Sequence, residues 1–332
     1  MSEKRRYFIR MGLGAVICVA AMQLLSPLMA ILGKPEVAQF LVYLETGRVV
    51  KLQLDPPVET EQPETETASP PPQQEQLVLS PADAQLIDIY YHWECQLDTQ
   101  AMLLSELDWD LTDQGPKVLI LHSHATESYT QTAQNHYEES SEYRTLDPDH
   151  NMLRVGQTLA QALEARGIGV IQDTTLHDHP SYTDAYIRSR ETARQYLERY
   201  PSICLVLDLH RDAAEMDGGG QLTTYAQVDG KDSAQIMLVV GSNAGGREHP
   251  GWQENMSLAL KLHAVLEKQN PGICKPMGLR TERFNQDLSS GALLVEIGAA
   301  GDTLEDALTA AEALAEGIYA LALGTTTTVS TS

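Results

Sequence analysis

Acidic and imidazole side chains follow three apolar segments of this sequence. Residues 118–121 are apolar and run into His122, His124 and Glu127; residues 204–207 run into a polar stretch that holds His210; and residues 293–295 run into Glu296. In open α/β sheets, functional residues gather beyond the carboxyl ends of the strands. If these segments are neighbouring strands, their polar side chains meet at one edge of a sheet.

Two neutral imidazoles and one carboxylate form a three-ligand shell that is typical of catalytic zinc and leaves a fourth position open. His124 and Glu127 are three residues apart, so one tight turn can aim both at a common point, and His210 completes the set. We therefore expect His124, Glu127 and His210 to bind Zn²⁺, which lowers the pKa of a bound water towards about 7. Because His122 is two residues from His124, it remains an alternative ligand.

Glu296 and Arg211 have expected roles around this set. We expect Glu296 near the metal but not ligating it, where it can act as the catalytic acid/base that takes a proton from water and delivers it to a leaving amine. Arg211 adds a positive charge for binding an anionic peptide. The H-x-x-E pattern alone is a frequent accident, but its combination with His210 and Glu296 at separate strand ends favours a metal site.

Competing signatures are weaker. The sequence contains no G-x-S-x-G motif, which argues against a serine hydrolase. No P-loop or G-x-G-x-x-G opens a helix. His177 and His179 lie in a polar loop, residues 173–182, and we expect them at the surface or in a substrate groove.

The elements that must position these residues are those of an α/β domain. Apolar runs predict five strands, at residues 117–121, 168–171, 203–209, 235–240 and 292–297. Three-and-four spacing and proline stops predict four helices, at residues 152–163, 184–199, 253–269 and 303–322. Runs that are apolar on both faces are typical of parallel strands covered by helices. The fold class is therefore α/β, with a mixed, largely parallel central sheet flanked by helices.

The N-terminal part of the chain differs from this domain. Residues 11–32 form 22 uncharged positions, long enough at about 1.5 Å per residue to cross a bilayer core of about 30 Å. Basic residues precede this segment, so we expect residues 1–10 to be cytoplasmic and the rest extracytoplasmic. Residues 33–80 read as a stalk with an acidic, Pro-rich linker, residues 81–322 as the catalytic domain, and residues 323–332 as a disordered tail.

The overall composition excludes two classes of protein. With 46 Asp and Glu against 23 Lys and Arg, the net charge of -23 argues against nucleic-acid binding. Three of the four cysteines would lie outside the membrane, an odd number that argues against a disulfide framework, although a Cys95–Cys274 bridge is left open. Cys204 sits in an apolar run and is expected in the core.

Several longer motifs resemble one known family. They are VLILHSHATESY at 118–129, SY at 181–182 with RSRE at 188–191, DLHRD at 208–212, FNQDL at 284–288 and LVEIG at 294–298. In order and spacing, over about residues 115–322, they are similar to the stage II sporulation protein P family.

This resemblance implies a zinc-dependent N-acetylmuramoyl-L-alanine amidase fold and a membrane-anchored enzyme that trims peptidoglycan during engulfment in spore-forming Firmicutes. It also implies cleavage of peptide cross-links and two partners, a stage II sporulation protein D-like lytic transglycosylase and a stage II sporulation protein M-like membrane scaffold. By motif matching, the ligands fall on the first motif's His and Glu and on His210, with Glu296 as acid/base. The enzyme would sit in the septal or engulfing cell membrane.

Two departures from the family pattern affect these expectations. Asp302 stands where an Asn is expected before Thr303, a change that keeps a helix N-cap. Ser123 and Ala125 flank His124 where Thr is common, which bears on hydrogen bonds around the ligands. Two other functions stay open: a metallopeptidase that cuts the stem peptide, and a catalytically silent wall-binding scaffold.

Overall fold

The computed structural model describes residues 77–327 except residues 108, 113, 215–219 and 325. A seven-stranded sheet crosses this body in the order β2-β9-β8-β10-β5-β3-β4. Its strands are β2 (Ile89–Tyr91), β3 (Val118–Leu121), β4 (Val170–Gln172), β5 (Leu205–Asp212), β8 (Ile236–Val240), β9 (Met277–Leu279) and β10 (Ala292–Ala299). All neighbours pair in parallel except β8 and β10, which are antiparallel. The expected α/β class with a mixed, largely parallel sheet is confirmed.

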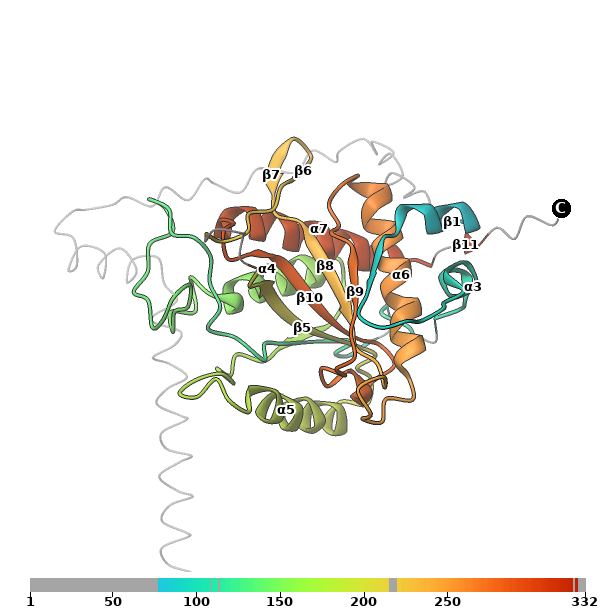
Figure 1. Ribbon diagram of the computed structural model, residues 1–332, viewed down its shortest axis with the longest axis horizontal. Coiled ribbons are helices and arrows are strands. Elements are labelled where there is room, and N and C mark those ends of the chain that lie inside the picture. Colours follow the sequence, from blue (N-terminus) through green and yellow to red (C-terminus); the bar gives the residue numbers. More distant parts are fainter. Residues whose placement is uncertain (1–76, 108, 113, 215–219, 325, 328–332) are drawn as a thin grey trace, which may run out of the picture. The chain divides into compact units, whose positions relative to one another are not determined.

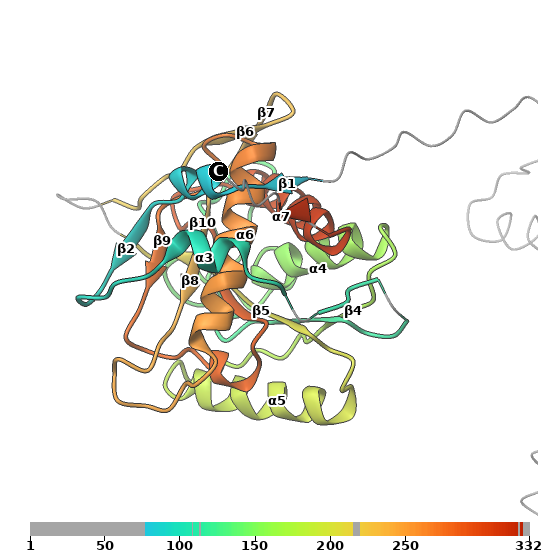
Figure 2. The ribbon, with the colours of Figure 1, turned by 90° about the vertical axis from the view of Figure 1, so that its right-hand side faces the viewer.

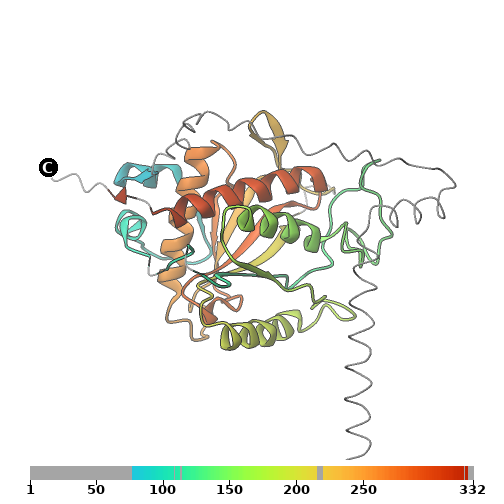
Figure 3. The same ribbon diagram turned by 180° about the vertical axis from the view of Figure 1, so that it is seen from behind.

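Helices cover both faces of this sheet (Figure 1). One face carries α4 (Met152–Glu164), α6 (Trp252–Gln269) and α7 (Leu304–Ala322). Of these, α7 contacts both α4 and α6, and α3 (Thr99–Leu104) packs on the outside of α6. The opposite face carries α5 (Ala185–Arg199), seen below the sheet from the front and from behind (Figure 3). The predicted helices are thus confirmed, each with one boundary shifted by a single residue.

Local sequence explains where two of these helices begin and end. The Asn151 side chain accepts a hydrogen bond from the Leu153 amide at 2.9 Å and caps α4, while Gly167, with φ of 83°, reverses the chain after it. At α7 the cap is Thr303, whose Oγ1 accepts from the Asp306 amide at 3.1 Å. Asp302 is therefore not the cap that its position suggested.

Short elements that the sequence pattern did not reveal complete the body. They include α3, β2 and β9. The others are η1 (Pro81–Leu86), the hairpin β6 (Ala226–Val228) with β7 (Lys231–Ser233), and η2 (Gln286–Leu288). In addition, β1 (Val78–Leu79) pairs in parallel with β11 (Thr326–Thr327), beside α6 and α7 in the side view (Figure 2). Leu79 is fully buried in the main core. The folded body thus starts before residue 81 and includes strand residues beyond residue 322.

The chain divides into two units, residues 1–73 and residues 74–332. The expected tail at 1–10, the span at 11–32 and most of the stalk lie outside the described residues. Among the helices in the part of the chain that the structure describes, none has the length and apolar character needed to cross a membrane. Cys95, Cys204 and Cys274 are all free, so the Cys95–Cys274 bridge is not formed.

Candidate active site

Strand periodicity places three of the polar residues on the α5 face of the sheet. Val206 and Ala292 pack in the small core beneath α5. Because side chains alternate between the faces of a strand, Asp208 and His210 follow Val206 on this face, and Glu296 follows Ala292. His210 on β5 and Glu296 on β10 are direct partners in the parallel register. The sheet therefore presents an imidazole and a carboxyl group side by side.

The turn after β3 brings His124 and Glu127 to the same place. The Glu127 amide donates to the His124 carbonyl at 3.2 Å, which closes the turn that follows the strand. The rings of His124 and His210 meet edge to face, with centroids 5.3 Å apart. Glu127 Oε2 lies 3.5 Å from His210 Nδ1. His124, Glu127 and His210 are all nearly buried, and the structure brings the expected set together.

His122 lies on the other face. It continues the alternation of Ile120, which belongs to the core beneath α4. Its ring is fully buried, with Nδ1 3.4 Å from the Leu209 carbonyl and Nε2 3.1 Å from Gln172 Nε2. A Cβ atom at Gly156 of α4 would stand 2.6 Å from His122 Nε2, so helix and ring are in close contact. Both ring nitrogens of His122 thus face protein groups that do not belong to the His124, Glu127 and His210 set.

Arg211 is turned into the protein rather than towards a substrate. Its residue is only 5% exposed, and its guanidinium donates from Nε to the Ser128 carbonyl at 3.0 Å and from Nη2 to the Tyr143 carbonyl at 3.1 Å. Its backbone amide also donates to Glu127 Oε2 at 3.3 Å. This placement does not support the expected contact between Arg211 and an anionic peptide substrate. The hydrogen bonds of Arg211 instead fix the segment that carries Glu127.

Asp208, the first residue of the DLHRD motif, is a site residue for which no role was predicted. Its carboxylate accepts hydrogen bonds from the Ser123 amide at 2.7 Å and from the Ser123 hydroxyl at 2.6 Å. Its Oδ1 lies 3.1 Å from His210 Nε2. The sequence pattern does indicate this position, because Asp208 precedes His210 by two residues in a strand and must share its face. Ser123, one of the departures from the family pattern, thus holds the carboxylate beside His210.

Arg144 and Tyr182 come from loops, and neither was predicted to belong to the site, although Tyr182 is part of the SY motif at 181–182. Arg144 Nη2 lies 3.1 Å from Glu127 Oε1, and its Nη1 donates to Asp178 Oδ2 at 2.8 Å. The Tyr182 ring stacks on His124 with centroids 4.3 Å apart, although Tyr182 is 59% exposed. The Arg144 guanidinium lies 5.0 Å from the Tyr182 ring centroid. These side chains form the solvent side of the site.

His177 lies in the interior of the protein, contrary to the expectation from the sequence. It was expected at the surface or in a groove, but it is buried, with Nδ1 3.0 Å from the His122 carbonyl and Nε2 3.0 Å from Thr192 Oγ1. The ring thus connects the loop after β4 to the segment after β3 and to α5. His177 therefore supports the segment that carries the site residues and is not itself one of them.

Burial and charge set the proton affinities of the site. Burial lowers the pKa of His124 to about 4 and raises the pKa of Glu296 to about 7. Burial also opposes charge on His210, but Asp208 and Glu127 outweigh it and raise the His210 pKa well above its usual value. Burial would raise the Glu127 pKa, yet the His210 hydrogen bond and Arg211 hold it low. The site thus favours a positive charge between its carboxylates.

Three buried polar atoms of this cluster have no hydrogen-bond partner: His124 Nδ1, His210 Nε2 and Glu296 Oε2. His210 Nε2 is close to Asp208 but not aligned for a hydrogen bond. Buried polar groups are normally satisfied, so orphaned imidazole nitrogens point to a missing electrophile. Two imidazoles with the Glu127 carboxylate fit the donor set of zinc.

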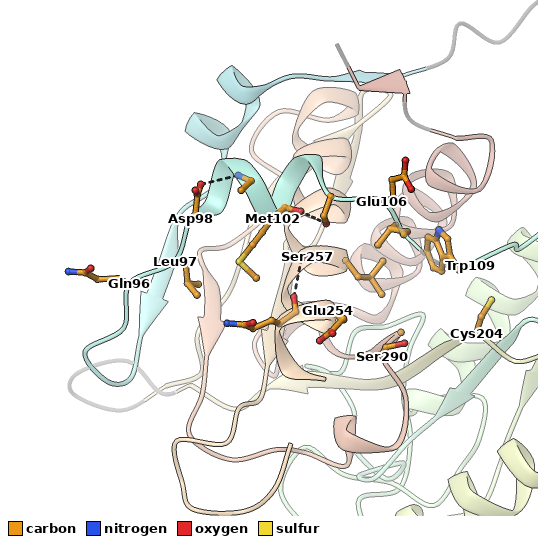
Figure 4. A pocket seen from close by; sticks show the side chains of 16 residues that line it. Gln96, Leu97, Asp98, Met102, Glu106, Trp109, Cys204, Glu254, Ser257 and Ser290 are labelled. Atoms are coloured by element: carbon orange, nitrogen blue, oxygen red, sulfur yellow. Dashed lines mark hydrogen bonds between the residues drawn. The ribbon is translucent and has the colours of Figure 1, made fainter. Parts of the chain in front are cut away.

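A pocket of about 540 Å³ between α3 and α6 carries no comparable chemistry (Figure 4). It is lined partly by Trp109 and reaches Cys204 and Gly291, the residues before β5 and β10. The pocket therefore lies at the end of the sheet where β5 and β10 begin, opposite to the end that carries the His210 cluster. Asp98 on its wall is engaged in capping α3, since its Oδ1 accepts from the Ala101 amide at 3.0 Å.

Comparison with known proteins decides the family. The model of the family described as Stage II sporulation protein P matches residues 41–319. The chain belongs to the stage II sporulation protein P family. Stage II sporulation protein P of Bacillus subtilis (strain 168) is 30% identical over 216 residues, which cover 60% of this chain and 49% of that protein. The chain thus spans about half the length of this curated relative of the stage II sporulation protein P family.

Solved structures similar to this family member are distant. The N-acetylmuramoyl-L-alanine amidase AmiC2 of Nostoc punctiforme is 15% identical with a TM-score of 0.37, over 62% of this chain and 97% of that one. The N-acetylmuramyl-L-alanine amidase Ami1 of Mycobacterium abscessus is 14% identical with a TM-score of 0.38, over 61% and 97%. Neither similarity is close enough to assign an activity to this member of the stage II sporulation protein P family.

Proposed function

We propose that this protein is a peptidoglycan hydrolase of sporulation, a zinc-dependent N-acetylmuramoyl-L-alanine amidase that also cuts peptide cross-links. The observation that carries the proposal is the convergence of His124, Glu127 and His210, with orphaned histidine nitrogens, directly beside Glu296. Membership of the stage II sporulation protein P family supports the setting. The substrate bond is the amide between muramic acid and the first alanine of the stem peptide.

His124, Glu127 and His210 would hold the metal, and His122 is assigned to the support of α4. When bound there, zinc would act as a Lewis acid that polarises the amide carbonyl and would lower the pKa of water so that it can lose a proton at neutral pH. Asp208 and Arg144 keep His210 and Glu127 in place through the contacts described above. Burial of the cluster excludes bulk water and strengthens each of these electrostatic interactions.

Glu296 is the proton carrier of the proposed reaction. Its Oε2 is buried without a partner, on the strand next to His210 and on the same face. A carboxylate so placed can accept a proton from the attacking water at Oε2 and deliver it to the leaving nitrogen. The exposed ring of Tyr182 over His124 then lies where the peptide must enter.

The cellular setting is proposed from the sequence. Residues 11–32 would anchor the protein in the cell membrane with residues 1–10 in the cytoplasm and the catalytic domain on the wall side. Peptidoglycan is then the macromolecular substrate. Stage II sporulation protein D-like transglycosylases and stage II sporulation protein M-like scaffolds are the proposed partners, by family resemblance alone.

Digestion of purified sacculi tests the activity. An amidase releases intact stem peptides from glycan strands, whereas a metallopeptidase leaves shortened stems attached, so fragment masses separate the two. Zinc-loaded protein should release intact stems, and Glu296→Gln protein should not. If wild-type protein with bound zinc leaves sacculi undigested, the wall-binding scaffold replaces the enzyme.

A further inference from the structure

A group of side chains of the types that ligate metals lies at the C-terminal end of α6. His263 and Glu267 are four residues apart and share one face of the helix, and Cys274 follows in the turn after it. One nitrogen, one oxygen and one sulfur atom of these residues all lie within 4.8 Å of one another. The three side chains belong to no part of the proposed active site.

His263 is buried, and one of its ring nitrogens has no hydrogen-bond partner. The residue is only 2% exposed, and its Nδ1 is buried without a hydrogen-bond partner. A buried imidazole nitrogen without a hydrogen-bond partner keeps its lone pair available to a metal.

Glu267 holds the turn that presents the thiol. Its Oε1 accepts from the Cys274 amide at 2.7 Å, and its Oε2 accepts from the Gly272 amide at 2.9 Å. Each carboxylate oxygen has a second lone pair, so these bonds orient the group and leave it able to ligate. Cys274 is free, and burial beside Glu267 raises the pKa of its thiol, so without a cation it remains neutral.

We propose that His263, Glu267 and Cys274 bind a second Zn²⁺ ion. Zinc takes imidazole nitrogen, carboxylate oxygen and thiolate sulfur at 2.0–2.3 Å in a tetrahedron, for which donor atoms already within 4.8 Å of each other are well placed. The ion displaces the thiol proton, and its charge balances the thiolate and the carboxylate. Water fills the fourth position.

This site joins two parts of the fold. Cys274 lies in a β-bridge with Ile236 at the start of β8, and His263 and Glu267 belong to α6. A metal there connects the end of α6 to the sheet. The proposal does not depend on the amidase activity, because its ligands and the active-site ligands are different residues.

Cobalt(II) binding to the purified full chain tests the site. A thiolate ligand gives cobalt a charge-transfer band in the near ultraviolet, and the His124, Glu127 and His210 set contains no sulfur. We expect the band in the wild type and in His210→Ala, and its loss in Cys274→Ser and His263→Ala. The matched control Cys204→Ser should keep it. Absence of the band in the wild type, or its persistence in Cys274→Ser, overturns the proposal.

A measurement on the unaltered protein covers the case in which Cys274→Ser does not fold. Zinc should protect one thiol of the wild type from slow alkylation, and peptide masses should identify it as Cys274. Removal of zinc by a chelator should restore its modification. Equal alkylation of Cys274 with and without zinc overturns the second site, while amidase activity in the same samples reports separately on the first.

Discussion

His210 and Glu296 are opposite one another on the parallel strands β5 and β10, and both project to the α5 face. This pairing places the Glu296 carboxyl group, whose Oε2 is buried, next to His210 without making Glu296 one of the three proposed ligands. A rigid sheet thereby sets the spacing between the metal-binding group and the proton carrier.

Glu296→Gln tests the proton carrier. Because the amide cannot accept the proton, we expect turnover on sacculi to fall by about 10²–10⁴-fold. The zinc content and the melting temperature should stay close to wild type, since Glu296 Oε2 has no hydrogen-bond partner to lose. Activity within a few-fold of wild type would exclude Glu296 from the reaction.

The two histidines of the first motif should respond differently. His124→Ala should empty the active-site metal position, whereas His122→Ala should keep zinc and lower the free energy of unfolding by about 1–3 kcal/mol, since it leaves buried partners unsatisfied. Metal analysis and urea unfolding of both variants check this. The exposed His136→Ala serves as control, and loss of zinc from His122→Ala with retention in His124→Ala would reverse the assignment.

Asp208→Asn tests a positioning residue. The variant keeps the size of the side chain but removes the charge beside His210 and one acceptor for Ser123. We expect zinc affinity to fall about 10–100-fold, as for other residues that orient a ligand. Competition with a chelating dye measures it, and Ser123→Ala, which keeps the carboxylate, should lose less. Unchanged affinity in a folded Asp208→Asn protein would show that His210 needs no such support.

An ion pair between α5 and η2 predicts a pH dependence of stability. Asp287 accepts from Arg190 Nη1 and Nη2, both at 2.7 Å, and Arg283 lies 3.2 Å away. Burial would raise the Asp287 pKa, but these arginines lower it below its usual 3.8. The stabilisation is therefore complete above the unfolded-state pKa and is lost as pH falls through the folded-state value.

Asp287→Asn should accordingly destabilise the protein by about 1–3 kcal/mol at neutral pH, and the difference from wild type should shrink in acid. Urea unfolding at neutral and at acidic pH measures this difference in stability, with the exposed Asp149→Asn as control. A difference that grows on acidification would contradict the assigned direction of the pKa shift.

The sequence predicted the main strands and helices because each is a long apolar run or a regular three-and-four pattern. It could not decide between His122 and His124, which are in phase along an extended chain. The strand ends at Leu121, and the turn that follows moves His124 towards the α5 face. The position of that turn therefore decides that His124 is the proposed metal ligand and that His122 supports α4.

Other features were hidden for different physical reasons. Strands of two or three residues such as β1 and β9 carry too little periodicity to be recognised. Tyr182 and Arg144 reach the site from loops, whose paths depend on tertiary contacts such as Arg144 with Asp178. The hydrogen bonds of Arg211 to the Ser128 and Tyr143 carbonyls likewise join residues far apart in sequence.

The parallel pairing of β1 with β11 has a topological consequence. Residues 78–79 and 326–327 stand next to each other, so a short linker from the end of β11 back to the start of β1 would close the body into a ring. New termini could then be opened in an exposed turn such as Asp229–Gly230 between β6 and β7. The order in which the strands are connected could thus be changed without altering how they pair.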